Sequence, residues 1–244
     1  MDWQRPTRIT NFISRRFERG VYLGLHLTIS LSIIIAALWL FGDVTEDVVR
    51  HEPLIQFDAT LLAWFGAHVS PTGIRIFAAI SWLGSPVVIA TLGLLVAAFL
   101  TYRRKWLLLS GWLMALAGTG ILDLALKYSV QRARPPDAST FLRGLSYSFP
   151  SGHALGSLVT YGMLAYLLAM FWAKRRTARI RLVAGAGVLI LAIGFSRLYL
   201  QVHFFSDVVG GYAVGVMWLT ACVTAVELAR RQPRPLEPTE PPAS

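Results

Sequence analysis

Long runs of apolar residues, separated by short polar or basic segments, organise this chain. Six runs have about 18 or more residues with almost no charge, enough at about 1.5 Å per residue to cross a hydrocarbon layer of about 30 Å. They cover approximately residues 21–41, 74–102, 106–126, 154–172, 182–200 and 208–227. Runs this long without alternation are not barrel strands, and only helices and closed barrels satisfy their backbone donors in lipid. The pattern predicts an all-α polytopic membrane protein, a bundle of six transmembrane helices.

The segment between the first two runs has its own pattern. Residues 42–52 are acidic and predict an outer loop, whereas apolar residues from Leu54 to Phe65 recur at helical spacing. That spacing predicts a short extracytoplasmic helix at the membrane interface, with a lid packed over the bundle as the alternative. Pro86, beside Gly84 and Ser85, predicts a kink in the second span.

Both ends of the chain differ from the apolar middle. Residues 1–20 form a basic leader, residues 21–229 the predicted membrane domain, and residues 230–244 a tail rich in Pro and Glu that is typical of disorder. A secretory signal is the rival interpretation of the start. The first apolar run is longer than a typical signal core, and no clear small-residue cleavage site follows it.

The charge distribution indicates membrane sides. The chain is 55% hydrophobic and 15% charged, with a net charge of +10. Most Lys and Arg residues lie in the leader, the tail and the loops after the second and fourth runs, which nucleic-acid binding does not require. The positive-inside rule therefore predicts a multi-pass protein of the cell (cytoplasmic or inner) membrane with both termini cytoplasmic. Three polar motifs then fall on the extracytoplasmic face.

The first motif, KYSVQRARP, contains Lys127 and Arg134. Seven helical steps return almost to the same face, so both cations can point at one anion if the helix persists as far as Pro135. Asp123 lies four residues before Lys127, so the two can pair on one helix face. Structural pairing is the favoured interpretation of Asp123, with a direct catalytic role as the alternative.

The second motif, PSGH, stands immediately before the fourth run. The first N–H groups of a helix have no internal partners and lie at its positive end, so anions bind there. Ser151 can cap the helix or bond a phosphate oxygen, Gly152 lets the backbone approach closely, and His153 stands at the rim. An ordinary helix cap with an incidental histidine is the alternative.

The third motif, SRLYLQVHFFSD, contains Arg197, His203 and Asp207. A carboxylate four residues from an imidazole on a helix can fix its tautomer and make it more basic. Arg197 is six residues before His203, so we expect the fifth span to end between them. A structural pair and half of a metal site are the alternatives, but no HExxH motif, acidic cluster or cysteine pair accompanies these residues, and we expect no metal.

These residue types match the needs of phosphomonoester hydrolysis, namely in-line attack, neutralisation of the equatorial oxygens and protonation of the leaving oxygen. We expect His203 to attack phosphorus, oriented by Asp207, and His153 to protonate the leaving alcohol and then activate water. The remaining residues would hold the phosphate in place of a divalent metal, without a cofactor: Lys127, Arg134, Ser151, Gly152 and Arg197.

The three motifs resemble those of the type 2 phosphatidic acid phosphatase superfamily of lipid phosphate phosphatases. The family pattern is a Lys seven residues before Arg-Pro, then PSGH, then Ser-Arg with a His six residues later and an Asp four after that, and every position is met here. The resemblance spans roughly residues 50–225. It implies a six-helix membrane core, an outer-face site and metal independence. Haloperoxidases that share this site are soluble, so the six apolar runs argue against that branch.

The resulting hypothesis is a membrane phosphatase acting on a lipid phosphate or diphosphate through a phosphohistidine. Undecaprenyl diphosphate, phosphatidylglycerol phosphate and phosphatidic acid are the candidate substrates. Arg143 is a candidate contact to a second phosphate or a glycerol, with an ordinary loop charge as the equal alternative. Lipid-to-lipid phosphotransfer is the alternative, followed by a non-catalytic lipid-phosphate binder or transporter. Nothing in the sequence predicts the oligomeric state.

Overall fold

The computed structural model of the protein describes residues 19–50, 53–136, 147–173 and 175–231, with side chains from residue 24 onward. Every regular element in these residues is an α-helix. The helices are α2 (Arg19–Arg50), α3 (Pro53–His68), α4 (Pro71–Leu83), α5 (Pro86–Tyr102), α6 (Trp106–Val130), α8 (Gly152–Phe171), α9 (Arg176–Tyr199) and α10 (Phe205–Arg231).

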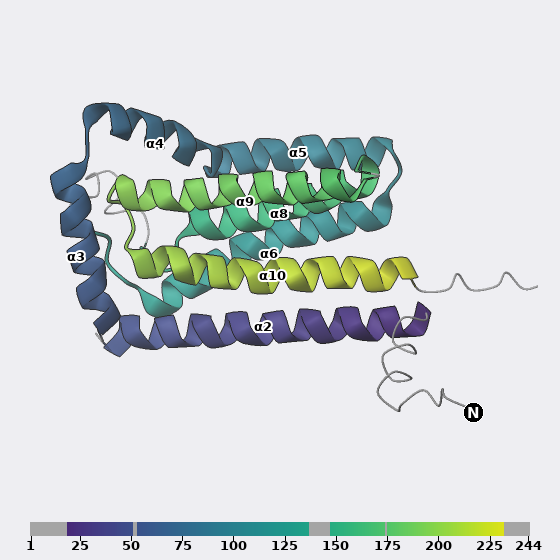
Figure 1. The fold of residues 1–244 in the computed structure, drawn as a ribbon, viewed down its shortest axis with the longest axis horizontal. Coiled ribbons are helices and arrows are strands. Elements are labelled where there is room, and N and C mark those ends of the chain that lie inside the picture. The colour runs from purple at the N-terminus through teal and green to yellow at the C-terminus, as the bar shows by residue number, and fades with distance from the viewer. Residues whose placement is uncertain (1–18, 51–52, 137–146, 174, 232–244) are drawn as a thin grey trace, which may run out of the picture.

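Six segments of the described chain are long and apolar enough to cross a membrane, which confirms the predicted six-helix bundle. They are Gly24–Arg50, Pro71–Tyr102, Trp106–Val130, Gly152–Phe171, Arg176–Tyr199 and Phe205–Arg231. The long helices lie side by side, and α3 lies across one end of the bundle (Figure 1). The α5–α6 and α8–α9 connections, with their basic residues, lie at the other end, which we call the basic end.

The centre of the bundle is a tightly packed apolar cluster. Trp112, Leu155 and Met163 are fully buried in it, and the indole N–H of Trp112 donates to the carbonyl oxygen of Gly93 at 3.0 Å. Large apolar side chains are also exposed around the bundle, such as Trp39 on α2, which is 71% exposed. Apolar side chains on both the inside and the outside are expected of helices surrounded by lipid.

The first helix is longer than predicted. Residues 42–52 were expected to form a loop, but α2 continues to Arg50. No Pro interrupts this stretch, and Glu46 forms an ion pair with Arg50 at 2.5 Å one turn apart. Val44 and Val48 are buried against Phe149, so packing holds these last turns of the helix.

Helix α3 combines the two predicted arrangements. It crosses the end of the bundle, as Figure 1 shows. Two of its own side chains, Asp58 and Phe65, are buried. Phe57 and Trp64 are about half exposed on the same helix. We call this end of the bundle the α3 end.

The second span is broken where the sequence predicted a kink. Helix α4 ends at Leu83 and α5 begins at Pro86, with the Ser85 hydroxyl accepting a capping hydrogen bond from the Val88 N–H at 3.3 Å. Proline at the first helical position has no N–H to leave unpaired, so it is well suited to restart a helix.

The predicted leader (1–20) and tail (230–244) lie almost entirely outside the described residues. Helix α2 begins at Arg19, and α10 ends at Arg231. The division of the chain into leader, membrane domain and tail therefore stays a prediction.

Candidate active site

A cavity of about 570 Å³ brings the three motifs together toward the α3 end of the bundle. Six of the eight predicted site residues line it: Lys127, Arg134, Gly152, His153, Arg197 and His203. Ser151 and Asp207 are buried next to lining residues. The cavity continues away from these polar groups between apolar side chains of α5 and α6, including Ile89 and Leu116.

Lys127 lies on the last turn of α6 and pairs with Asp123. Its Nζ is 2.8 Å from Asp123 Oδ2, which is the pair that the four-residue spacing predicted. Asp123 Oδ1 has no hydrogen-bond partner within the described chain. A Cβ at Gly152 would come within 2.9 Å of that oxygen, so a glycine is needed where α6 and α8 approach each other.

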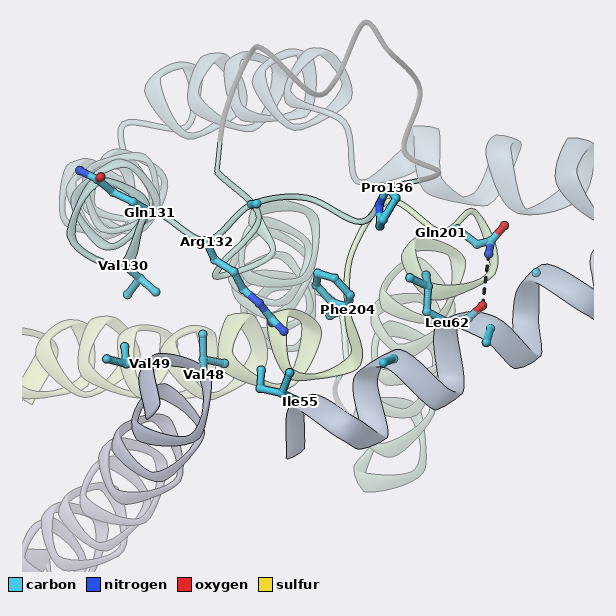
Figure 2. Close-up of a pocket in the computed structure, with 14 residues that line it drawn as sticks. Val48, Val49, Ile55, Leu62, Val130, Gln131, Arg132, Pro136, Gln201 and Phe204 are labelled. Atoms are coloured by element: carbon cyan, nitrogen blue, oxygen red, sulfur yellow. Dashed lines mark hydrogen bonds between the residues drawn. The ribbon is translucent and has the colours of Figure 1, made fainter. Parts of the chain in front are cut away.

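Arg134 reaches the cavity by a different route from the one predicted. Helix α6 ends at Val130, and Gln131 takes the left-handed conformation with φ of 52°, so the helix does not persist to Pro135. The segment that follows is not helical, and its arginines diverge. Arg134 lines the cavity with the histidines, whereas Arg132 lines a separate cavity of about 790 Å³ (Figure 2).

Arg134 is held against the third motif. Its guanidinium donates to the carbonyl oxygen of Val202 at 3.1 Å and lies 3.3 Å from Nε2 of His203. Burial lowers the pKa of Arg134 below its usual value, while the carboxylates of Asp207 and Asp123 oppose that shift. An anion entering the cavity would find this cation partly desolvated, where charge-assisted hydrogen bonds are strong.

The second motif starts α8, as predicted. Ser151 is the N-cap residue, but its Oγ makes no capping bond and has no partner in the described residues. The Ser151 N–H donates to the carbonyl oxygen of Asp207 at 2.9 Å, which fastens this turn to α10. His153, in the first turn of α8, therefore lies in the same cavity as His203.

His203 and Asp207 form the predicted pair, although not on a continuous helix. Helix α10 begins at Phe205, so His203 precedes it, and its Nδ1 is 3.2 Å from Asp207 Oδ2. A carboxylate at Nδ1 favours the tautomer with the proton on that nitrogen, which leaves Nε2 with its lone pair toward the cavity.

Burial lowers the pKa of His203 to about 4, against the raising effect of Asp207 and with further lowering by Arg197 and Arg134. The imidazole is therefore uncharged at neutral pH. An uncharged imidazole has the free electron pair that a nucleophile needs.

Arg197 lies on the last turns of α9, which ends at Tyr199, between Arg197 and His203 as predicted. The guanidinium is buried and donates to the hydroxyl of Ser81 on α4. Its Nε has no hydrogen-bond partner within the described chain. Ser81 was not predicted to take part, because 116 residues separate it from Arg197 and no local spacing links them.

Two charged residues near the site were also missed. Asp58 on α3 and Arg132 after α6 form an ion pair at 2.8 Å, and Arg132 also contacts Asp207 at 2.6 Å. Arg143, the candidate contact to a second phosphate or a glycerol, lies outside the described residues.

No group of three or more His, Cys, Asp or Glu side chains within the described residues is placed to hold a metal ion. The absence of a metal from the mechanism stays a prediction. The positive groups around the cavity are the protein's own side chains, and they can do for a phosphate what a divalent cation does elsewhere.

Known proteins are similar to this chain in sequence and in fold. A family model described as the PAP2 superfamily matches residues 106–231. The chain belongs to the PAP2 superfamily. It is 35% identical over 148 residues to phosphatidylglycerophosphatase B of Bacillus subtilis (strain 168), an alignment that covers 60% of this chain and 68% of that protein.

A solved structure supports the same assignment. The crystal structure of a transmembrane PAP2-type phosphatidylglycerolphosphate phosphatase from Bacillus subtilis superposes with a TM-score of 0.70 and 26% identity. The match covers 83% of this chain and 98% of that one. The protein is accordingly a multi-pass membrane lipid phosphatase of the PAP2 superfamily.

Proposed function

We propose that this PAP2 protein removes the terminal phosphate of a membrane lipid through a phosphohistidine on His203, without a metal, at the extracytoplasmic face. One observation carries the proposal. The Asp207-oriented imidazole of His203 faces a cavity that also contains His153 and the cations Lys127, Arg134 and Arg197.

The chemistry follows from the atoms that face the cavity. Nε2 of His203 attacks phosphorus, and the bond from phosphorus to the alcohol oxygen breaks as the phosphohistidine forms. His153 donates a proton to the departing oxygen, which leaves as the alcohol. His153 then takes a proton from water, whose oxygen attacks the phosphohistidine to release phosphate and free His203. Throughout, the surrounding cations neutralise the charge on the equatorial oxygens.

The shape of the cavity supports a lipid substrate. Its polar groups lie toward the α3 end, and its apolar lining runs along α5 and α6, including Pro86, Ile89 and Leu116. A phosphorylated headgroup fits the polar part, while the first carbons of an acyl or prenyl chain fit the apolar part. Such a substrate would react without leaving the membrane.

Among the candidate substrates, the relatives favour phosphatidylglycerophosphate. Both the curated relative and the superposed crystal structure bear the name of a phosphatase for that lipid. We propose phosphatidylglycerophosphate as the first substrate to test, with undecaprenyl diphosphate and phosphatidic acid at the same concentration in the same detergent micelles. The highest kcat/KM for either of the other two would overturn this choice of lipid while leaving the chemistry intact.

The charge pattern supports an extracytoplasmic site. The basic α5–α6 and α8–α9 connections lie at one end of the bundle (Figure 1). The charged residues that line the cavity, Lys127, Arg134 and Arg197, lie at or after the opposite ends of α6 and α9. A membrane-impermeant thiol reagent tests this orientation in intact cells, because the native Cys222 is buried. We expect labelling of Thr60→Cys on α3 and no labelling of Lys105→Cys at the basic end. The reverse pattern would place the site on the cytoplasmic side.

The nucleophile is tested by phosphate release in the presence of a chelator. We expect the wild type to retain its activity with chelator, and His203→Ala to lose at least about a thousandfold in kcat, because no other group replaces the attacking nitrogen. His68→Ala is the matched control, since His68 is an exposed histidine on α3 whose ring, within the described residues, hydrogen-bonds to the carbonyl oxygen of Trp64 on the same helix. Equal rates for wild type and His203→Ala would remove the assignment. Supplying an acceptor lipid distinguishes hydrolysis from phosphotransfer, which would release little free phosphate.

A further inference from the structure

A buried ionic cluster lies on the side of Asp207 that faces away from His203. One member is Asp58 on α3, which is only 1% exposed. A buried carboxylate is costly unless donors surround it. Asp58 receives hydrogen bonds from Arg132 Nη2 at 2.8 Å, from the Ser206 N–H at 3.0 Å and from the Ser206 hydroxyl.

Arg132 joins this carboxylate to Asp207. Its Nη1 donates to Asp207 Oδ1 at 2.6 Å and to Ser206 Oγ at 2.7 Å, while Nη2 donates to Asp58. Its guanidinium carbon lies over the ring of Phe204, 4.2 Å from the centroid. Figure 2 shows Arg132 extending past Phe204 toward α3. A planar guanidinium with fixed donors can hold two carboxylates at once in a way that a lysine cannot.

The two oxygens of Asp207 are held from opposite sides. Oδ1 accepts from Arg132, whereas Oδ2 accepts from the Phe204 N–H at 2.9 Å and faces Nδ1 of His203 at 3.2 Å. A carboxylate fixed in this way cannot rotate about its terminal bond without breaking a charge-assisted hydrogen bond. The orientation of Asp207 therefore sets the orientation of the His203 ring.

We propose that Asp58 and Arg132 are positioning residues for the nucleophile, which hold Asp207 in the orientation that aims Nε2 of His203 into the cavity. This role rests on the proposed phosphohistidine chemistry. Neither residue lines the cavity that contains His153 and His203, so both act through Asp207 and not on the phosphate.

The cluster also sets how strongly Asp207 acts on His203. The charged or titratable groups around the imidazole are Asp207 on α10, Arg197 on α9, His153 on α8 and Arg134 after α6. Arg132 opposes the negative charge of Asp207 from behind, and Asp58 in turn opposes Arg132. The two residues therefore have opposite electrostatic effects on the imidazole.

This opposition gives a test that a merely structural role would not pass. Arg132→Gln removes a cation, so we expect the acid limb of the kcat/KM profile to move to higher pH. Asp58→Asn removes a negative charge while keeping a side chain of similar shape, so we expect the acid limb to move to lower pH. Each shift should be roughly one pH unit or less, because both groups act from behind Asp207.

The steady-state constants give the second readout. We expect Arg132→Gln to lower kcat by about 100-fold and Asp58→Asn by about tenfold, because small errors in aiming an attacking atom are costly. KM should stay within about threefold of wild type, since the phosphate-holding cations are untouched. Glu46→Gln is the matched control, because the Glu46–Arg50 pair lies at the same end of the bundle but is exposed, and it should leave both constants unchanged.

Milder variants keep the test valid if a buried substitution prevents folding. Arg132→Lys preserves the positive charge but loses the planar guanidinium that contacts both carboxylates. It should therefore lower kcat while leaving the acid limb in place. Ser206→Ala removes the hydroxyl that accepts from Arg132 and donates to Asp58. It should lower kcat by only about threefold, because the direct ion pair between Arg132 and Asp58 remains. Elution as a single peak in detergent establishes which variants are folded.

The outcomes separate the two proposals. Suppose that the wild type is active and His203→Ala is not. If the folded Arg132 and Asp58 variants then show a normal kcat and an unmoved acid limb, the positioning role alone is overturned. Equal losses with limbs moving in the same direction would also overturn it, because that is the result of general loosening. A wild type that releases no phosphate from any lipid tested would remove the proposed function and the positioning role with it.

Discussion

The two arginines of the segment after α6 occupy opposite electrostatic surroundings. Arg134 lies in a cavity with Lys127 and Arg197, where Asp123 is the one carboxylate among the described lining residues. Arg132, two residues earlier, contacts the carboxylates of Asp58 and Asp207 within 2.8 Å. One side of the segment thus has an excess of positive charge, whereas the charges on the other side are balanced by the protein's own carboxylates. Two arginines in the same short segment can therefore differ in role according to the charges around them, and the proposed phosphate contact requires the unbalanced one.

The largest effect should follow from changing Asp207, because this carboxylate contacts both Arg132 and His203. Asp207→Asn keeps the shape but removes the charge that fixes the His203 tautomer, so we expect kcat to fall by about a thousandfold or more. Phosphate release from phosphatidylglycerophosphate micelles measures it. A loss of less than tenfold would show that His203 does not depend on this carboxylate.

The next effect concerns the excess of positive charge. Arg197→Lys keeps the positive charge but loses the planar guanidinium with its several donors. We expect kcat/KM to fall by about 100-fold, which is typical when a donor that stabilises the transition state is lost. The matched variant is Arg75→Lys, on the same α4 helix as Ser81 but exposed to the surroundings, which should be silent. Equal effects of the two substitutions would mean that Arg197 does not hold the phosphate.

A smaller effect of opposite sign is expected at Asp123. Asp123→Asn can still accept the Lys127 hydrogen bond but removes the negative charge from the cavity lining. A phosphate dianion should then bind more tightly, with KM lower by about threefold and kcat changed less than KM. Loss of kcat by about 100-fold or more would instead give Asp123 a direct part in the chemistry.

The smallest effect is that of mild acid. Because the pKa of His203 is lowered to about 4, its imidazole stays uncharged as pH falls from 7 and is protonated only near pH 4. The NMR signals of the 15N-labelled His203 ring should therefore change little between pH 7 and 5.5. A transition centred near pH 6.5 in those signals would indicate an imidazole with an ordinary pKa.

The sequence predicted the groups that face the cavity better than the way they are supported. Motifs with fixed spacing predicted His153 and His203, which line the cavity, and Asp207, which is buried beside His203, because short-range spacing is visible in one chain. The route to Arg134 was wrong, since Gln131 adopts a left-handed conformation that ends α6 before the proline acts. The loop expected before Arg50 was also wrong, because burial of Val44 and Val48 continues the helix.

The supporting residues had no such signal. Asp58 lies 148 residues from Ser206 and 74 from Arg132, so no periodicity relates them. A carboxylate in the segment of α3 is equally compatible with an interfacial helix, where it would be solvated, and with a lid packed over the bundle. Only the packing of α3 onto the bundle shows that Asp58 is buried.

The position of Asp58 has a consequence for the smallest fragment that could work. The family match begins at residue 106, yet Asp58 belongs to α3, and α2 packs along α10 before the chain reaches it. A fragment restricted to the matched region would retain every motif and still lack the anion behind Arg132. If Asp58 positions Asp207 as proposed, the smallest active fragment must extend beyond the family match to include α3 and the helix α2 that precedes it.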